Sequence, residues 1–252
     1  MRTLGILAVL LAGALIAQAS PNGPTSVRYT VESAMTSSDV GADASGRVQA
    51  YSKKVGSSDH YRLRLNAAGL APKTTYTVLA QIGSDPYFVA VTNFTTGSHG
   101  SGRVVYLNSS ARSGTASRRA LPQVLNPVST VRAIAVADSD GQVVLSTDLH
   151  QAESMRFEIA SVFENTGNDA AAIGCVAIAC QGGGVQFRLF AAGDSSQFTF
   201  CVNGAPVETY HADAMGHISV GAFPAAAPSP LDFLSLSLRN SADQVVLQSD
   251  VR

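Results

Sequence analysis

The residues best suited to binding chemistry are three arginines, Arg112, Arg118 and Arg119, in the turn-rich stretch 109–127. No acidic residue lies in that stretch, and a planar guanidinium group holds a carboxylate or sulfate group with two parallel hydrogen bonds. Loops carried by a rigid β-framework are a common place for binding residues. We therefore predict a ligand site here, with the carboxylate or sulfate groups of a glycan as its partner. The alternative is a solvated loop without a ligand.

A second pattern raises the question of catalysis. Ser98 and His99 are adjacent in the glycine-rich stretch 97–102. The chain has no Gly-x-Ser-x-Gly sequence, which presents the nucleophile in one large class of serine hydrolases. Glycines at this density are typical of a turn, because glycine adopts backbone conformations that other residues avoid. We interpret the stretch as a turn and predict no catalytic residue in the chain.

Metal binding is the next possibility, and the histidines and aspartates argue against it. The five histidines are His60, His99, His150, His211 and His217. No two of them have the His-x-His or His-Glu-x-x-His spacing that zinc and copper sites use. The segment Asp138-Ser-Asp140-Gly141 spells part of a calcium loop but lacks the distal Glu, so a hairpin turn is the better interpretation. We predict no metal and no cofactor.

Three cysteines, Cys175, Cys180 and Cys201, all lie in the second half of the chain. Cys175 and Cys180 are on one expected strand, about 16 Å apart, and a disulfide joins Cα atoms within about 7 Å. These two therefore cannot bridge each other. The possible disulfide joins Cys201 to either Cys175 or Cys180, and the alternative is three unpaired, half-buried thiols.

The segments expected to position these residues occur twice in the sequence, as two series of similar stretches. The three clearest echoes are Arg28–Ala34 with Arg156–Val162, Tyr61–Gly69 with Val185–Gly193, and Val143–Asp148 with Val245–Asp250. Two pairs of glycines also align, Gly46 with Gly174 and Gly102 with Gly216. The echoes predict an internal duplication. A residue needed for folding should then tend to recur in both copies, whereas a residue specific to a site need not.

The residue patterns of both copies are typical of strands and turns. Between 61 and 65, Tyr61, Leu63 and Leu65 alternate with Arg62 and Arg64. Alternation with period two is typical of a strand with one buried face. We therefore predict an all-β fold of two tandem antiparallel β-sandwich (immunoglobulin-like) domains. The expected boundaries are 20–149 for the first repeat, 150–155 for a linker, and 156–252 for the second repeat.

The N-terminal stretch 1–19 has the pattern of a signal peptide. Arg2 precedes an apolar run from Leu4 to Ile16, and Ala17-Gln-Ala19 is a small-x-small cleavage sequence. The run is shorter than the roughly 20 residues that span a bilayer. Without Arg2 the chain has 16 basic and 18 acidic side chains, a balance that favours neither nucleic acid nor an anionic membrane. We expect an exported protein, periplasmic or extracellular, with no membrane span in the mature chain.

One set of motifs resembles a known kind of module. The segments are Phe187-Arg-Leu, Phe198-Thr-Phe-Cys-Val-Asn-Gly204 and Val245-Val-Leu, with Leu70-Ala-Pro-Lys-Thr-Thr-Tyr76 in the first copy. They resemble the tandem immunoglobulin-like β-sandwich repeat of uncharacterised exported bacterial proteins. The resemblance implies sandwich domains with no assigned activity, and it carries over no catalytic residue.

These observations favour a non-catalytic exported protein with a structural or binding role in the cell envelope or extracellular space. Its expected partner is an unknown protein or glycan, and not nucleic acid. One alternative is a carbohydrate-binding accessory module, for which Phe190 and Tyr210 are the aromatic candidates. The other is a secreted hydrolase that uses His99 or His211. An aromatic row on one sheet would support the first alternative, and turnover of ester or glycoside substrates would support the second.

Overall fold

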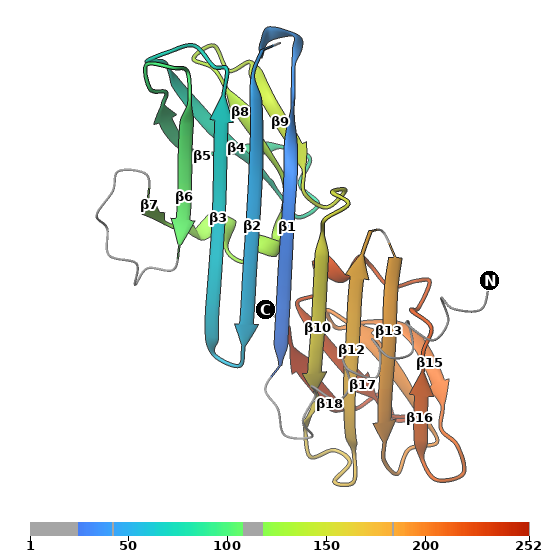
Figure 1. Cartoon of the computed structure of the whole chain (residues 1–252). Helices are drawn as coiled ribbons and strands as arrows, with labels where there is room; N and C mark the ends of the chain where they lie inside the picture. Colours follow the sequence, from blue (N-terminus) through green and yellow to red (C-terminus); the bar gives the residue numbers. More distant parts are fainter. Residues whose placement is uncertain (1–24, 42, 108–117, 183, 252) are drawn as a thin grey trace, which may run out of the picture.

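The computed structural model describes residues 25–41, 43–107, 118–182 and 184–251, which form an all-β fold (Figure 1). The predicted all-β class is confirmed. No α-helix occurs in these ranges. The helical turns present there are short 3-10 segments: η1 (Asp39–Gly41), η2 (Gln123–Leu125), η3 (Val128–Thr130) and η4 (Pro230–Asp232).

One long layer of strands runs through both halves of the chain (Figure 1). Its strand order is β16-β13-β12-β10-β1-β2-β3-β6-β7. The first half contributes β1 (Ser26–Ser37), β2 (Ser45–Val55), β3 (Ser58–Ala68), β6 (Gly102–Leu107) and β7 (Arg118–Ala120). The second half contributes β10 (Arg156–Val162), β12 (Ile173–Gln181), β13 (Gly184–Ala192) and β16 (His217–Val220). Strands of the two halves are thus hydrogen-bonded to each other within one sheet.

Each half also has a back layer. In the first half it consists of β4 (Thr75–Ile82), β5 (Phe88–Thr95), β8 (Val131–Ala137) and β9 (Val143–Asp148). In the second half it is a separate sheet of β11 (Glu164–Asn165), β14 (Gln197–Val202), β15 (Ala205–His211), β17 (Ser235–Arg239) and β18 (Val245–Asp250). The end of β1 pairs with β9, so the first back layer is continuous with the long layer, which curls at this point.

The alternation in the sequence decides which side chains fill the space between the layers. Leu63 and Leu65 of β3 are buried, whereas Arg62 between the same strand's apolar residues is exposed. In the second half, Phe187 of the long layer contacts Phe200 of the back layer, with ring centroids 5.7 Å apart. Burying an apolar side chain of this size stabilises a fold by about 1.5–3 kcal/mol. The core therefore lies between the long layer and the back layers.

Strands β1 and β10, which carry the first sequence echo, pair with each other across the halves. The pairing is antiparallel, and Tyr29 lies opposite Phe157, its own counterpart in the echo. An antiparallel pair of equivalent strands that is centred on equivalent residues has local twofold symmetry. Both side chains are fully buried, at 0% exposure. The join between the halves therefore has the geometry of a symmetric edge-to-edge contact.

Hydroxyl contacts flank this residue pair on both sides. In the first half, the hydroxyls of Ser33 and Thr147 are 2.7 Å apart. In the second half, the hydroxyls of Ser161 and Ser249 form the matching hydrogen bond. The two serines are equivalent in the echo of the first strands, and Thr147 and Ser249 are equivalent in the echo of the last strands. The same polar contact therefore lies at two related places.

The chain before each first strand crosses to the other half. Thr25, which precedes β1, places its hydroxyl 2.9 Å from Ser161 and 3.0 Å from Ser249. Ser154, which precedes β10, accepts a hydrogen bond from the Glu32 amide and donates one to the Glu32 carbonyl. Ser154 lies in the predicted linker 150–155, so this segment contacts the first half as well as joining the halves.

Gly46 and Gly174, which the sequence comparison aligned, have the same role in the two halves. A Cβ atom on Gly46 would lie 2.8 Å from the sulfur of Met35, and one on Gly174 would lie 2.9 Å from Cδ1 of Leu247. Both distances are shorter than carbon and sulfur atoms tolerate. The residues crowding the two sites also correspond: Met35 and Leu145 in the first half, Phe163 and Leu247 in the second.

The predicted alignment of Gly102 with Gly216 is wrong by two residues. Gly216 lies in the turn before β16 with φ of 77°, and its counterpart is Gly100 with φ of 68°. Each donates its amide to the carbonyl three residues earlier. Left-handed backbone favours glycine, so these two positions match. Gly102 instead lies in β6, where an added Cβ would be 2.2 Å from the ring of Phe94.

Within the described ranges, no helix is long and apolar enough to cross a membrane. The predicted signal peptide at 1–19 lies outside the described residues.

Candidate functional site

The predicted arginine loop is only partly described. Arg112 lies outside the described residues, and Arg118 and Arg119 begin the short strand β7, which pairs in parallel with β6. The Arg119 guanidinium donates a hydrogen bond to the hydroxyl of Thr92 on β5. Burial raises the pKa of the neighbouring Tyr106, while Thr92 and Arg119 partly offset that rise. Arg119 is therefore held at the edge of the first half.

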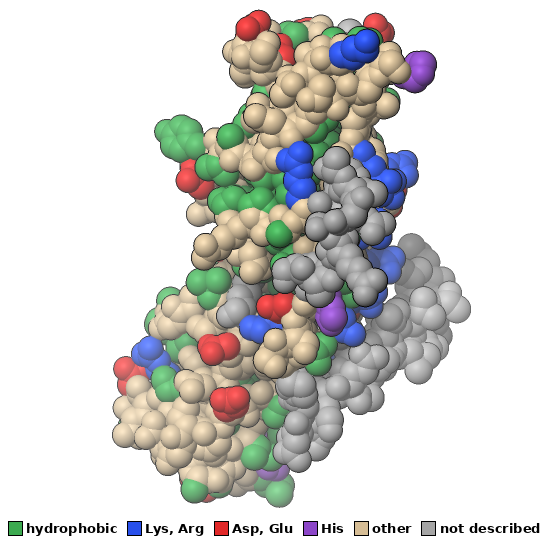
Figure 2. Space-filling view, turned by 90° about the vertical axis from the view of Figure 1, so that its left-hand side faces the viewer, with side chains coloured by type: hydrophobic (Ala, Val, Ile, Leu, Met, Phe, Trp, Pro, Cys, Tyr) green, Lys and Arg blue, Asp and Glu red, His purple; other side chains and the backbone are tan. Residues whose placement is uncertain are grey.

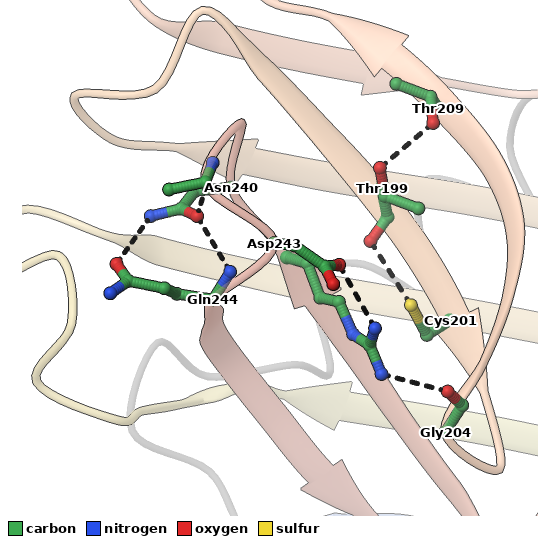
Figure 3. Close-up of polar contacts among 9 residues, drawn as sticks. Thr199, Cys201, Gly204, Thr209, Asn240, Asp243 and Gln244 are labelled. Atoms are coloured by element: carbon green, nitrogen blue, oxygen red, sulfur yellow. Dashed lines mark hydrogen bonds and ion pairs between the residues drawn. The ribbon is translucent and has the colours of Figure 1, made fainter.

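All three cysteines lie in the described ranges, and all are free thiols. Cys175 and Cys180 are both on β12, as the spacing predicted. Cys201 is on β14 of the back layer, on the side opposite the core residue Phe200. Cys201 forms no disulfide with β12 in this structure, because its side chain lies on the side of β14 away from the core, whereas Cys180 faces the core. The Cys201 thiol donates a hydrogen bond to the Thr199 carbonyl of its own strand, at 3.7 Å (Figure 3).

Arg239 lies beside Cys201 on the same surface of the back layer. Its guanidinium donates to Asp243 at 3.1 Å and to the carbonyl of Gly204 at 3.0 Å (Figure 3). Burial raises the pKa of the Cys201 thiol, and the positive charge of Arg239 partly opposes that rise. Burial also raises the pKa of Cys180, to about 11. Neither thiol is set up as a nucleophile, because the reactive species is the thiolate.

The other motifs fold into turns. The amide of Gly100 donates to the carbonyl of Gly97, so the Ser98-His99 pair lies within a turn. A carboxylate oxygen of Asp138 accepts from the amides of Asp140 and Gln142, which closes the expected hairpin. No group of three or more metal-binding side chains comes together among the described residues.

The largest charge asymmetry lies on a surface that the loop prediction did not include. We call the side of the long layer that is turned away from the back layers the outer face. Directly paired residues in a ladder share a face, so the strand registers identify its side chains. Among the side chains that the structure describes on this face, eight are basic and two, Glu32 and Glu158, are acidic. The basic ones are Arg28, Arg47, Lys53, Arg62, Arg64, Arg103, Arg156 and Arg188.

This asymmetry is large for a chain whose 17 basic and 18 acidic residues nearly cancel. Figure 2 shows the outer face of the first half in profile, with Lys and Arg side chains gathered along its right-hand edge. Opposite charges within a Debye length, about 8 Å at physiological salt, attract through solvent. A face with this excess of positive charge attracts anions even though the net charge of the chain is slightly negative.

Few of the basic groups on the outer face are neutralised. Glu32 forms an ion pair with Arg47 at 2.6 Å, and its other oxygen accepts from Gln49 at 2.8 Å. Among the described residues, none of the other seven basic side chains on this face has an ion pair. Of these seven, Arg64 donates a hydrogen bond from Nε to Oδ1 of Asn66 at 3.2 Å, and Arg28 lies opposite Glu158 in the ladder. Without ion pairs, the charges of these side chains are available to an anionic partner.

Two cavities accompany this surface. One of about 310 Å³ lies between the halves, and Arg132, His150, Met155, Cys180 and Asp232 contribute to its lining. Burial lowers the pKa of His150 there, while its hydrogen bond to the Ser129 carbonyl and the charge of Asp148 oppose that change. The other, about 420 Å³, lies on the outer face of the second half beside Arg188 and Phe190.

Comparison of the chain with protein families, with curated proteins and with solved structures found no match.

Sequence reasoning missed the outer face, although part of the pattern was visible. The alternation at 61–65 correctly separated Arg62 and Arg64 from the core. Grouping them with Lys53 and Arg103 requires the pairing of β3 with both β2 and β6. These residues are far apart in the sequence, whereas Arg112, Arg118 and Arg119 are close together there. Proximity along the chain therefore drew attention to the loop instead of the sheet.

Proposed function

We propose that this chain is a non-catalytic exported protein of two tandem immunoglobulin-like β-sandwich domains that arose by internal duplication. The duplication is supported by the local symmetry of the β1–β10 pair and by the recurring glycine contacts. It is further supported by β-bulges at matching places, after Val78 and Phe200 in one pair of strands and after Val136 and Leu238 in another. Export is supported by the sequence of residues 1–19.

We further propose that its role is to bind an anionic partner of the cell envelope or extracellular space. The observation that carries this proposal is the composition of the outer face, with eight basic side chains and two acidic ones. A continuous layer joins the halves, so the charges are held on a hydrogen-bonded framework instead of on separate loops. Binding to such a framework requires little ordering of the protein, which favours affinity.

Chromatography at about 0.15 M salt tests this role. The mature chain is passed over agarose beads carrying sulfate or carboxylate groups and over unmodified agarose. We expect retention on both anionic resins, with elution as the salt concentration rises, and no retention on the neutral resin. Without residues 1–19 the chain has 16 basic and 18 acidic side chains, a net charge of −2, so retention on an anionic resin requires a local basic surface. Passage of the protein through all three resins without delay would contradict the proposal.

A carbohydrate-binding accessory role is the second candidate. It is favoured by the cavity on the outer face of the second half, where Phe190 is 38% exposed beside Arg188. The lining of this cavity is mostly apolar, and an exposed aromatic side chain there suits the apolar face of a sugar ring. Glycan-array binding that is lost in Phe190→Ala but retained at high salt would support this role over simple anion binding.

A further inference from the structure

The arrangement of charges on the outer face indicates what kind of anion it takes. Resting on the anion binding proposed above, we propose that an extended anionic polysaccharide lies across β10, β1, β2, β3 and β6. Its carboxylate or sulfate groups would bind Arg28, Lys53, Arg62, Arg64 and Arg103 of the first half. The second half would contribute only Arg156 at the end of this row.

The two halves provide an internal control for this assignment. Equivalent positions can be matched by their strand partners: Lys53 pairs with Arg28 as Gln181 pairs with Arg156. In the same way Arg62 corresponds to Gln186, and Arg103 corresponds to Ser219. The second half forms the same ladders without these three charges. The fold therefore does not require the positive charges at 53, 62 and 103, as expected of residues that serve a ligand.

The charges are spread over a wide area, which suits a linear polymer better than a small anion. Neighbouring strands lie about 4.8 Å apart, so the five strands from β10 to β6 span roughly 19 Å. Along the row that contains Arg62, direct pairing connects Arg62 to Tyr51, Thr30 and then Arg156 on β10. A face of this width presents several cations to the anionic groups of one chain.

The neutral side chains between the charges favour a polysaccharide over other polyanions. They include Gln49, Asn66, Thr30 and Tyr51, whose amides and hydroxyls suit the hydroxyl groups of sugars. Binding of single-stranded nucleic acid uses a series of aromatic platforms. Tyr51 is the single aromatic residue on the part of this face formed by β1, β2 and β3. Insertion into a membrane uses exposed apolar side chains. The apolar residues that pair with Arg64 and Arg62 on this face, Val105 and Leu107 of β6, are buried and half-buried.

A variant that copies the second half tests the proposal. In Lys53→Gln/Arg62→Gln/Arg103→Ser, each residue becomes its counterpart from the other half. Binding is measured in about 0.15 M salt with heparin, polygalacturonate and neutral dextran, and also with phosphatidylglycerol vesicles and poly-dT. We expect the mature wild-type chain to bind heparin or polygalacturonate, and the triple variant to bind about tenfold more weakly with an unchanged thermal midpoint.

A matched pair of single variants controls for net charge. Arg62→Gln removes one charge from the outer face, and Lys73→Asn removes one from the exposed turn before β4. Asparagine tolerates the left-handed backbone of position 73, where φ is 53°. We expect Arg62→Gln to weaken binding and Lys73→Asn to leave it unchanged. Equal losses in both single variants, or full binding by the triple variant, would overturn the assignment to this face.

The other probes distinguish the polysaccharide assignment from the broader proposal that the chain binds anions. Stronger wild-type binding to vesicles or poly-dT than to either anionic polysaccharide would overturn the polysaccharide assignment and leave anion binding standing. Equal binding to neutral dextran and polygalacturonate would also overturn it, because charge would then not matter. Failure to bind any of the anionic probes would remove both proposals together.

Discussion

Substituting Tyr29 by Phe should stabilise the protein. Tyr29 is 0% exposed, and its hydroxyl has no hydrogen-bond partner among the described residues. Its counterpart across the β1–β10 pair is Phe157, so the same position tolerates a ring without the hydroxyl. A buried polar group without a partner costs about 1–3 kcal/mol. Removing the oxygen atom relieves this cost but leaves a small void, and the void offsets part of the stabilisation.

We therefore expect Tyr29→Phe to raise the free energy of unfolding by about 1 kcal/mol, or 2–4 °C in thermal midpoint for a chain of roughly this size. Urea unfolding followed by far-ultraviolet circular dichroism measures the difference. The reverse change, Phe157→Tyr, is the matched control. It adds a hydroxyl at the equivalent buried position and should destabilise the protein by about 1–3 kcal/mol.

The pH dependence gives the same prediction a second test. Burial, with a smaller contribution from Asp148, raises the pKa of Tyr29 above its ordinary value of 10.0. The folded state therefore keeps the proton at a pH where the unfolded state loses it. The stability due to the neutral phenol is complete below pH 10 and decreases as the pH rises above that value. The advantage of Tyr29→Phe over wild type should thus grow above pH 10.

A result that would refute this reasoning is a loss of more than about 1 kcal/mol in Tyr29→Phe at neutral pH, because that loss would mean that the hydroxyl makes a favourable contact. A second is an equal response of both variants to alkaline pH, because wild type alone carries the buried phenol at position 29.

Three further outcomes follow from the packing and the titrating groups. Gly174→Ala should destabilise the protein by about 1–3 kcal/mol in urea unfolding, because the new Cβ would lie 2.9 Å from Cδ1 of Leu247; an unchanged midpoint would contradict the contact. Thiol titration without reductant should detect three thiols in denaturant, with slow labelling of Cys180 and Cys201 in the native protein; a single thiol in denaturant would instead indicate a disulfide. The His150 ring should titrate below its ordinary pKa of 6.5 in NMR spectra, so its contribution to stability is lost as pH falls below that value; a midpoint above 6.5 would show that burial does not dominate.

Local patterns in the sequence were sufficient to predict the strands and their buried sides. The alternation around Leu63 and Leu65 predicted which residues enter the core, because side-chain direction in a strand depends only on position. The hairpin at Asp140-Gly141 was also correctly expected, because its turn chemistry is local. These predictions required no knowledge of which strands are neighbours.

The predictions that failed or were missed depended on such neighbours. Gly102 was aligned with Gly216 by residue type, whereas the turn geometry matches Gly100 with Gly216. The pairing of β1 with β10 joins residues more than 120 positions apart, and no periodicity in the sequence specifies it. The outer face likewise brings Lys53, Arg62 and Arg103 together only through ladder pairing.

The β1–β10 pairing also has a consequence for solubility. A strand at the edge of a sheet offers unpaired amides and carbonyls to any other strand, and such edges promote aggregation. Here residues 26–30 of β1 and 156–160 of β10 occupy each other's open edges. Each half thereby protects the other from foreign strands. Proteolysis that separated the halves would expose both edges, and the fragments should then self-associate through the same surfaces.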